Sequence, residues 1–441
     1  MKRIYIQLLS FACLCFGFTV NSYAVPAIQT AQLDNGLKIL LIEAHNVPMV
    51  SMQLTMPAGS RFDKPEKAGT ASMLAEVLGD NTAKHDDKAW AEWLDSEALR
   101  LGASASRDSL SLSLTVVKES LTVGLDAFSE ALLQPGWRKK RFLSLREDNI
   151  AAAIKSQETP GAQASQATAK LLYGTHAYGH TTSGTAKSLP HIQLADLKDL
   201  YLKQVRPVGS VLAVSGDITM REILALIAPR LQSWQGKPET AALDMKQPMI
   251  VKGQYAHVNI PTSQALVQFS RLGIARSSTD FFPLFVMNHL LGGGGFGSKL
   301  MEEVREKRGL VYGVYSYFIP LAAPGPFIIT LQTRAEQAEK ATQVVRDVMQ
   351  SMADGKIDKK QLNASKNNLI GSFAQRMDSN RERVGLLSMI GFYQMPLDYL
   401  QRWTAHVQSV TLADVKHMSK TYLQGNDWNI IEVGPAKEKE Q

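Results

Sequence analysis

Two histidines in the chain are spaced like the ligands of a metal ion. His176 and His180 lie four positions apart in the run His-Ala-Tyr-Gly-His, and imidazole is a common zinc ligand. The run has the composition of a loop, and no third ligand lies near it. A structural pair is therefore the favoured interpretation. A further histidine, His289, lies in a helical pattern and is expected to form a local hydrogen bond.

A glycine-rich segment offers a second kind of chemistry. Residues 292–299 are Gly-Gly-Gly-Gly-Phe-Gly-Ser-Lys, which is similar to a phosphate-binding loop. Such a loop follows a strand and ends in Gly-Lys-Ser/Thr, whereas this segment follows a helical pattern and lacks that ending. We therefore interpret it as a flexible loop beside a binding cleft.

The residues after these glycines place an arginine and a tyrosine seven positions apart. Ser298 is expected to cap a helix over 299–308. Arg305 then lies about one turn from the end of that helix, and Tyr312 lies at the start of the next strand. The alternative is a purely local role, in which Arg305 pairs with Glu302 and Tyr312 packs on the sheet.

Hydrophobic periodicity predicts the elements that position these residues. In the first half, the expected strands are 37–42, 50–56, 109–116 and 211–217, and the expected helices are 69–78, 88–101, 121–133 and 220–234. In the second half, the expected strands are 265–272, 310–319 and 428–434, and the expected helices are 281–291 and 299–308. Strands grouped with helices, without strict alternation, favour an α+β fold.

An internal repeat divides the chain into two homologous domains. The run Leu-Ala-Asp-Leu-Lys at Leu194 recurs as Leu-Ala-Asp-Val-Lys at Leu412, and an apolar strand ending at Gly216 recurs at Gly434. Both pairs are separated by 218 positions, which is too long for a solenoid repeat. Each domain is expected to contain an antiparallel-rich sheet with helices on one face. The expected bounds are 25–235 and 248–441, joined by a linker over 236–247.

The N-terminus has the features of a cleaved secretory signal. Lys2 and Arg3 precede an apolar run over 4–20, and a small-x-small site ends at Ala24. We expect a signal peptide over 1–24 and a periplasmic mature protein. An uncleaved anchor is less favoured because the run is short for a membrane span, and no later segment is expected to insert stably in a membrane.

Composition excludes several other classes. Cys13 and Cys15 both lie in the leader, so no disulfide framework is expected in the mature chain. The formal net charge is +7, or +5 without Lys2 and Arg3. The basic residues are scattered, which argues against nucleic-acid binding. The densest basic run, 138–141, is interpreted as a solvated helix face.

Several motifs together resemble one family over almost the whole mature chain. The motifs are Gly-Ala-Ser-Ala-Ser-Arg-Asp at 102–108, His-Ala-Tyr-Gly-His at 176–180, Arg-Pro at 206–207, Gly-Gly-Gly at 292–294 and Glu-Val-Arg-Glu-Lys-Arg-Gly-Leu-Val-Tyr at 303–312. They are similar to motifs of the pitrilysin/insulinase-type zinc peptidases, the inverzincins, which include mitochondrial processing peptidase. The resemblance implies the two-domain α+β fold.

The zinc motif of that family, G-x-x-H-x-x-E-H, falls on a stretch that lacks its ligands. Overlay from Gly69 puts Ser72 at the first His, Ala75 at the Glu and Glu76 at the second His. The distal Glu ligand falls on Ala153. Glu76 alone cannot hold zinc, so the resemblance is to the inactive subunit type, and we expect no metal or cofactor in this chain.

The resemblance also assigns roles in the second half. Arg305 and Tyr312 match the family's second-half pair, in which Tyr donates a hydrogen bond to the developing oxyanion and Arg contacts a substrate carbonyl. Gly292, Gly293 and Gly294 would then lie at the substrate cleft.

These expectations combine into one leading hypothesis. The chain would be a non-catalytic subunit of a heterodimeric zinc endopeptidase, inactive alone. A homologous partner would carry H-x-x-E-H and zinc, and the two chains would enclose an unfolded peptide. The alternative is a structural or peptide-binding scaffold without a role in catalysis, like the family's inactive core proteins of respiratory complexes. An autonomous protease would need catalytic groups that the sequence does not offer.

Overall fold

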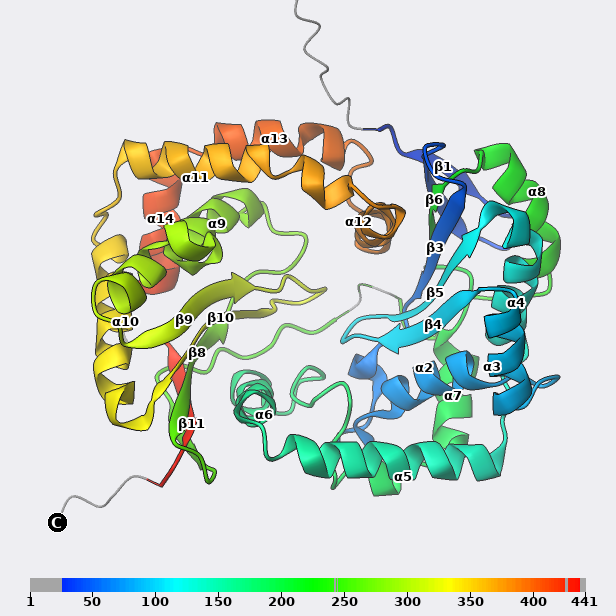
Figure 1. Cartoon of the computed structure of the whole chain (residues 1–441), viewed down its shortest axis with the longest axis horizontal. Coiled ribbons are helices and arrows are strands. Elements are labelled where there is room, and N and C mark those ends of the chain that lie inside the picture. The colour runs from blue at the N-terminus through cyan, green and yellow to red at the C-terminus, as the bar shows by residue number, and fades with distance from the viewer. Residues whose placement is uncertain (1–25, 242, 244, 425–426, 437–441) are drawn as a thin grey trace, which may run out of the picture.

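The chain folds into two halves that each contain one β-sheet (Figure 1). The computed structural model describes residues 26–241, 243, 245–424 and 427–436. The signal peptide expected over 1–24 lies outside these residues. Within them, no helix combines the length and the apolar character that a membrane span needs.

Six strands form the sheet of the first half, in the order β1-β2-β6-β3-β5-β4. Their bounds are β1 Gln29–Gln32, β2 Lys38–Glu43, β3 Met49–Met56, β4 Arg100–Ala105, β5 Leu110–Val117 and β6 Val211–Gly216. Only the β2–β6 pair is parallel. In β5, Leu110, Leu112 and Leu114 are buried on one face while Ser111 and Ser113 point to the other. One face of this sheet is therefore apolar and the other carries hydroxyl groups.

The sheet of the second half repeats this plan with five strands, in the order β7-β11-β8-β10-β9. Their bounds are β7 Tyr255–Asn259, β8 Gln264–Leu272, β9 Val311–Phe318, β10 Pro326–Arg334 and β11 Asn429–Gly434. The β7–β11 pair is parallel and the others are antiparallel, as in the first sheet. The strands β2, β6, β3, β5 and β4 thus correspond to β7, β11, β8, β10 and β9. The expected α+β fold of two homologous domains is confirmed.

Helices of each half pack around the apolar face of its sheet (Figure 1). The first half contributes α2 Thr70–Asp80, α3 Asp87–Ser96, α4 Leu121–Leu133, α5 Lys139–Ser156, α7 Leu194–Gln204 and α8 Met220–Leu231. The second half contributes α9 Phe281–Asn288, α10 Ala338–Ala353, α11 Lys359–Gly371, α13 Tyr399–Ser409 and α14 Leu412–Leu423. In α10, Ala341, Val344, Val345 and Val348 are buried, because helical spacing places them in one apolar stripe that faces the core.

Each half also lends one helix to the sheet of the other half. Helix α6, Pro160–Tyr173, packs on β8 and β11, whereas α12, Asn380–Phe392, packs on β3 and β6. The contact of α12 is close, because a Cβ on Gly391 would lie 2.5 Å from Cγ1 of Val211. This exchange couples the two halves, and the expectation of helices on one face alone omits it.

Three expected elements differ from the structure. The helix expected over 88–101 ends at Ser96, because Ala98 adopts a positive φ of 51° and β4 begins at Arg100. The helix expected over 281–291 ends as α9 at Asn288 and continues as a π-helical turn, η6, over His289–Gly293. The helix expected over 299–308 is present, but residues Met301–Glu306 form a π-helix, η8. Between α8 and β7, which includes the expected linker 236–247, the described residues form no helix or strand.

Candidate functional site

Helix α2 carries three of the positions that match the family's zinc motif. It begins after Gly69, whose φ of +105° favours glycine. The Asp63 carboxylate accepts hydrogen bonds from the N–H groups of Gly69 and Ala71, at 2.9 and 3.0 Å. Asp63 therefore takes the place of an N-cap side chain. Burial raises the pKa of Asp63 to about 7, although these N–H donors oppose the shift.

The zinc-motif positions do not form a metal site. Ala75 is buried in the core, and Glu76 accepts a hydrogen bond of 2.6 Å from Nδ2 of Asn149 on α5. Burial raises the pKa of Glu76 above its ordinary value. Ala153 lies one turn beyond Asn149 on the same helix, and Ser72 supplies only a hydroxyl group. Zinc needs three or four His, Cys or carboxylate ligands, so this donor set does not fit zinc. No group of three or more such residues is close enough to bind a metal anywhere in the described part of the chain.

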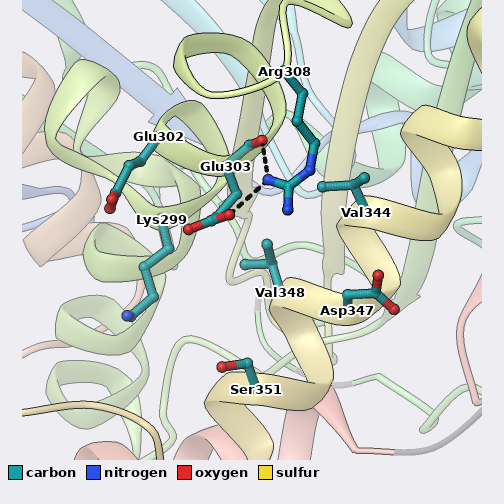
Figure 2. A pocket seen from close by; sticks show the side chains of 8 residues that line it. All are labelled: Lys299, Glu302, Glu303, Arg308, Val344, Asp347, Val348 and Ser351. Carbon is teal, nitrogen blue, oxygen red and sulfur yellow. Dashed lines mark hydrogen bonds and ion pairs between the residues drawn. The ribbon is translucent and has the colours of Figure 1, made fainter.

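The helix that carries Arg305 is held by its own ion pairs. Lys307 contacts both Glu302 and Glu303 at 2.7 Å, and Arg308 donates to Glu303 at 2.7 Å. Figure 2 shows the Glu303–Arg308 pair in a pocket of about 220 Å³ between this helix and α10. Glu302 is paired with Lys307, and among the described residues Arg305 forms no ion pair with Glu302, so the local alternative is wrong on this point.

The expected cap of this helix is also wrong. The Ser298 hydroxyl donates to the carbonyl oxygen of Gly295 at 2.7 Å, so it turns away from the helix it was expected to cap. The backbone carbonyl of Ser298 does accept from the N–H of Glu302. Ser298 thus closes the preceding 3-10 turn, η7 Gly295–Gly297, instead of supplying a side-chain cap.

Arg305 and Tyr312 both lie at the surface of the second half, where Arg305 is half-buried and Tyr312 is exposed. The Arg305 guanidinium lies 4.8 Å from the centroid of the Phe296 ring, which is itself exposed. Tyr312 is 79% exposed and lies on β9, the edge strand of its sheet. Tyr315 and Tyr317 on the same strand are also exposed, at 49% and 39%. Tyr312 therefore does not pack on the sheet, contrary to the local alternative.

The three glycines expected at the substrate cleft are required by close packing. A Cβ on Gly292 would lie 2.6 Å from the backbone nitrogen of Ser316 on β9. The same atom on Gly293 or Gly294 would lie 2.6 or 2.7 Å from Asn288 or His289. The segment forms the helical turns η6 and η7 rather than the flexible loop that was expected. A contact of these glycines with substrate stays a prediction.

The expectation of a satisfied histidine pair holds for His176 but not for His180, whose Nε2 atom is buried without a hydrogen-bond partner among the described residues. His176 Nε2 lies 2.9 Å from the carbonyl oxygen of Lys246, and the ring of His180 does not share a partner with it. His289 contacts Ser365 at 2.7 Å and Asn368 at 3.2 Å, both on α11. The local hydrogen bond expected for His289 is therefore replaced by contacts to another helix.

A buried carboxylate joins the two halves, and sequence reasoning did not single it out. Asp108, in the β4–β5 turn, accepts hydrogen bonds from the hydroxyls of Tyr178 and Tyr393. It also accepts from the N–H of Ala322 at 2.8 Å. Burial raises the pKa of both tyrosines, and the Asp108 charge adds to the shift. The only sequence signal was the position of Asp108 at the end of a quoted motif, because its partners lie far away in the chain.

Comparisons with known proteins point to one family. Residues 38–185 match the insulinase family, peptidase family M16, and residues 191–369 match the peptidase M16 inactive domain. A crystal structure of a peptidase M16 inactive domain from Pseudomonas fluorescens is 34% identical, with a TM-score of 0.88, and covers 94% of this chain and 99% of that one.

Two relatives come from Helicobacter pylori. A protein named as the non-peptidase homologue YmxG is 25% identical over 92% of this chain and 94% of its own length. The crystal structure of a protease from that organism has a TM-score of 0.86 at 19% identity, covers 93% of this chain and 100% of its own, and supports the fold alone.

Proposed function

This chain belongs to the insulinase-type peptidase family M16 as an inactive member, and we propose that it is the non-catalytic subunit of a zinc endopeptidase. Its partner would be a homologous chain that carries the H-x-x-E-H helix and the zinc ion. Neither zinc nor another cofactor would bind to this chain itself. The expected leader would place the pair in the periplasm, and the family resemblance suggests unfolded peptides as the substrate.

The observation that carries the proposal is a contrast between two sets of residues. The positions of the zinc motif hold Ser72, Ala75 and a Glu76 side chain already bound to Asn149. Arg305 and Tyr312, by comparison, are both present, with Tyr312 exposed and Arg305 half-buried against the Phe296 ring. An exposed tyrosine on a free sheet edge gains nothing for folding, because large apolar rings stabilise a protein when they are buried. The exposure of Tyr312 supports a contact with something outside this chain.

The two side chains would act on a peptide held between the subunits. The Tyr312 hydroxyl would donate to the peptide carbonyl oxygen as negative charge develops on it, which stabilises the transition state. Arg305 would donate to a second peptide carbonyl and hold the substrate in position. The metal-bound water and the general base would both belong to the partner.

A mixing experiment tests this function. The mature chain and an H-x-x-E-H homologue from the same organism are purified separately, and cleavage of an unfolded peptide is measured for each alone and for mixtures. The expected result is little or no turnover by either chain, and turnover that saturates at equal amounts of the two. Activity of the partner alone that this chain does not increase would reject the proposal.

The alternative is a scaffold that assembles with a partner without taking part in catalysis. It predicts co-purification of the two chains, with turnover that depends on assembly but not on Arg305 or Tyr312. Substitution of these two residues in the assembled pair therefore separates the two functions.

A further inference from the structure

The first half contains a polar pocket beside the position of the lost metal ligand. It has a volume of about 410 Å³ and lies where the start of α2, the α5–α6 corner, the β4–β5 turn and the loop 181–184 meet. Ser72, which replaces the first zinc-binding histidine, is part of its wall. Most of the remaining wall is made of hydroxyl and amide groups, including those of Ser156, Ser165, Thr182, Gln157 and Gln166.

One cation faces this neutral wall. Arg107 is the only charged residue among those that line the pocket. Among the described residues, its guanidinium has no ion pair or hydrogen bond, and its Nε atom is buried without a partner. The guanidinium lies 5.9 Å from the centroid of the Tyr173 ring, which is a neutral neighbour. An unpaired, partly buried cation is costly, and such groups are normally paired with an anion.

The carboxylate nearest to Arg107 along the chain already accepts hydrogen bonds from other groups. Asp108 follows Arg107 directly, but its oxygens accept from Tyr178, Tyr393 and the N–H of Ala322. Arg61, a more deeply buried arginine nearby in the chain at 7% exposure, differs from Arg107 in that its Nη2 atom donates to the carbonyl oxygen of Ala241 at 2.9 Å. Arg107 therefore has a guanidinium free to bind a group from outside.

We propose that this pocket binds a carboxylate of a peptide, with Arg107 as the counter-ion and the pocket hydroxyls and amides as further donors. A guanidinium matches a carboxylate through two parallel hydrogen bonds. A single arginine suits one such planar anion better than a phosphate dianion, which attracts several cations. The inference rests on the proposed function, because it takes a peptide as the ligand. In this chain the loss of the metal site leaves an anchoring site for peptides.

The carboxylate has two sources, the C-terminus of a peptide or an acidic side chain within it. Three short, N-acetylated peptides with a neutral fluorophore separate them. The first has a free C-terminus and no acidic side chain, the second has an amidated C-terminus and no acidic side chain, and the third is amidated with one internal glutamate. Binding to the mature chain is measured by fluorescence polarisation without any partner.

The first or the third peptide is expected to bind more tightly than the second, and the tighter of the two identifies the source. Arg107→Gln should raise the Kd of that peptide roughly 10- to 100-fold, the value of a charge-assisted hydrogen bond, and leave the second peptide unchanged. Arg100→Gln is the matched control, since Arg100 is an exposed arginine at the start of β4, the strand that leads into the turn holding Arg107, and it does not line this pocket. It should leave all three affinities unchanged.

A second variant keeps the test valid if Arg107→Gln folds poorly. Gln166→Glu places a carboxylate in the pocket wall, so it should weaken binding of the same peptide while raising the melting temperature. Equal affinity for the three peptides, no binding by any of them, or unchanged affinity in both variants would overturn the proposal. Failure of the proposed function gives a different result. The mixed subunits would then show no turnover, although this chain would still prefer the peptide with a carboxylate and lose that preference in Arg107→Gln.

Discussion

The edge strands β4 and β9 occupy equivalent places in the two sheets but present opposite surfaces. Strand β4 carries Gly102, Ala103 and Ser104, and a Cβ on Gly102 would meet nothing within 4 Å. Strand β9 carries Tyr312 and Tyr315 on its exposed side. Small side chains leave the unpaired backbone groups of an edge strand accessible, whereas tyrosines add rings and hydroxyl groups. Strand order has been kept by the two halves while their exposed side chains have diverged.

A related contrast lies within helix α2, which precedes β4 in the chain. The buried residues of α2, such as Ala71, Leu74 and Leu78, still form an apolar stripe, although its zinc-motif positions no longer fit a metal. Packing requires only that the stripe be apolar, whereas metal ligation requires particular side chains at positions 72, 75 and 76. A duplicated fold can therefore lose a catalytic site in one half without losing its architecture.

Helices α2 and α9 begin differently: the buried Asp63 carboxylate accepts a hydrogen bond at the start of α2, whereas α9 has no side-chain cap. The largest effect on stability is expected at Asp63. The pKa of Asp63 is about 7 in the folded protein against an ordinary value of 3.8. Between about pH 4 and about pH 7, the Asp63 carboxyl group is therefore protonated in the folded state and ionised in the unfolded state. The contribution of Asp63 to stability is greatest below about pH 4 and falls by up to about 4 kcal/mol as pH rises to about 7.

Urea unfolding of the wild type and of Asp63→Asn, compared at about pH 5 and about pH 8, checks this prediction. Only the wild type should lose stability through Asp63 across that interval. An equal pH dependence in the two proteins would show that the carboxylate does not titrate as described.

A second prediction concerns the contact between the halves. Asp108→Asn keeps the shape of the side chain but removes the charge that two tyrosine hydroxyls and a backbone N–H share. It should lower the free energy of unfolding by about 2–3 kcal/mol, as charge-assisted hydrogen bonds become neutral. Tyr393→Phe, which removes one donor, should cost about 1 kcal/mol. Denaturant unfolding measures both, and a negligible effect of Asp108→Asn would show that the halves are held by α6 and α12 alone.

A third prediction concerns the surface of the second half. Arg305→Ala in an assembled, active complex should raise the apparent KM and lower kcat/KM by roughly tenfold, because it removes a contact made in the ground state as well. Arg308→Ala is the control, since Arg308 pairs with Glu303 on the same helix. Peptide cleavage with assembly checked by size-exclusion provides the measurement. An effect of Arg308→Ala equal to that of Arg305→Ala would point to helix disruption rather than substrate contact.

The smallest effect is expected from rebuilding the metal site. The combination Ser72→His, Ala75→Glu, Glu76→His and Ala153→Glu restores the ligand types but not the groups that orient them. Asn149, which contacts residue 76, would remain in place. The variant should show no appreciable turnover alone, by the same peptide assay. Activity comparable with that of the natural complex would contradict this.

Local patterns predicted much of the fold. Alternation placed β3 and β5 within one residue of their observed bounds, and the 218-position repeat predicted the shared plan of the two sheets. The exchange of α6 and α12 was not predictable, because an apolar stripe does not say which sheet it will cover. The helix expected over 88–101 was overextended because its apolar spacing continues beyond Ser96 into the start of β4.

The candidate site was predictable only in part. The missing zinc ligands and the Arg305–Tyr312 spacing are visible in the sequence. The exposure of the Tyr312 side chain is not. Asp108 and Arg107 escaped notice because their importance depends on partners that are distant in the chain or absent from it. Long-range polar contacts have no periodicity, so only the folded structure brings them together.

We propose that the partner supplies zinc and that this chain supplies an exposed tyrosine. Substitution of Tyr312 tests this division of roles most directly. Turnover is measured for assembled complexes that contain wild type, Tyr312→Phe or the control Tyr315→Phe, an exposed tyrosine on the same strand. Tyr312→Phe should lower turnover roughly 10²–10³-fold with little change in KM, the usual cost of one lost oxyanion donor. Tyr315→Phe should leave turnover nearly unchanged. Full turnover in an assembled Tyr312→Phe complex would contradict the account and favour a scaffold without a catalytic role.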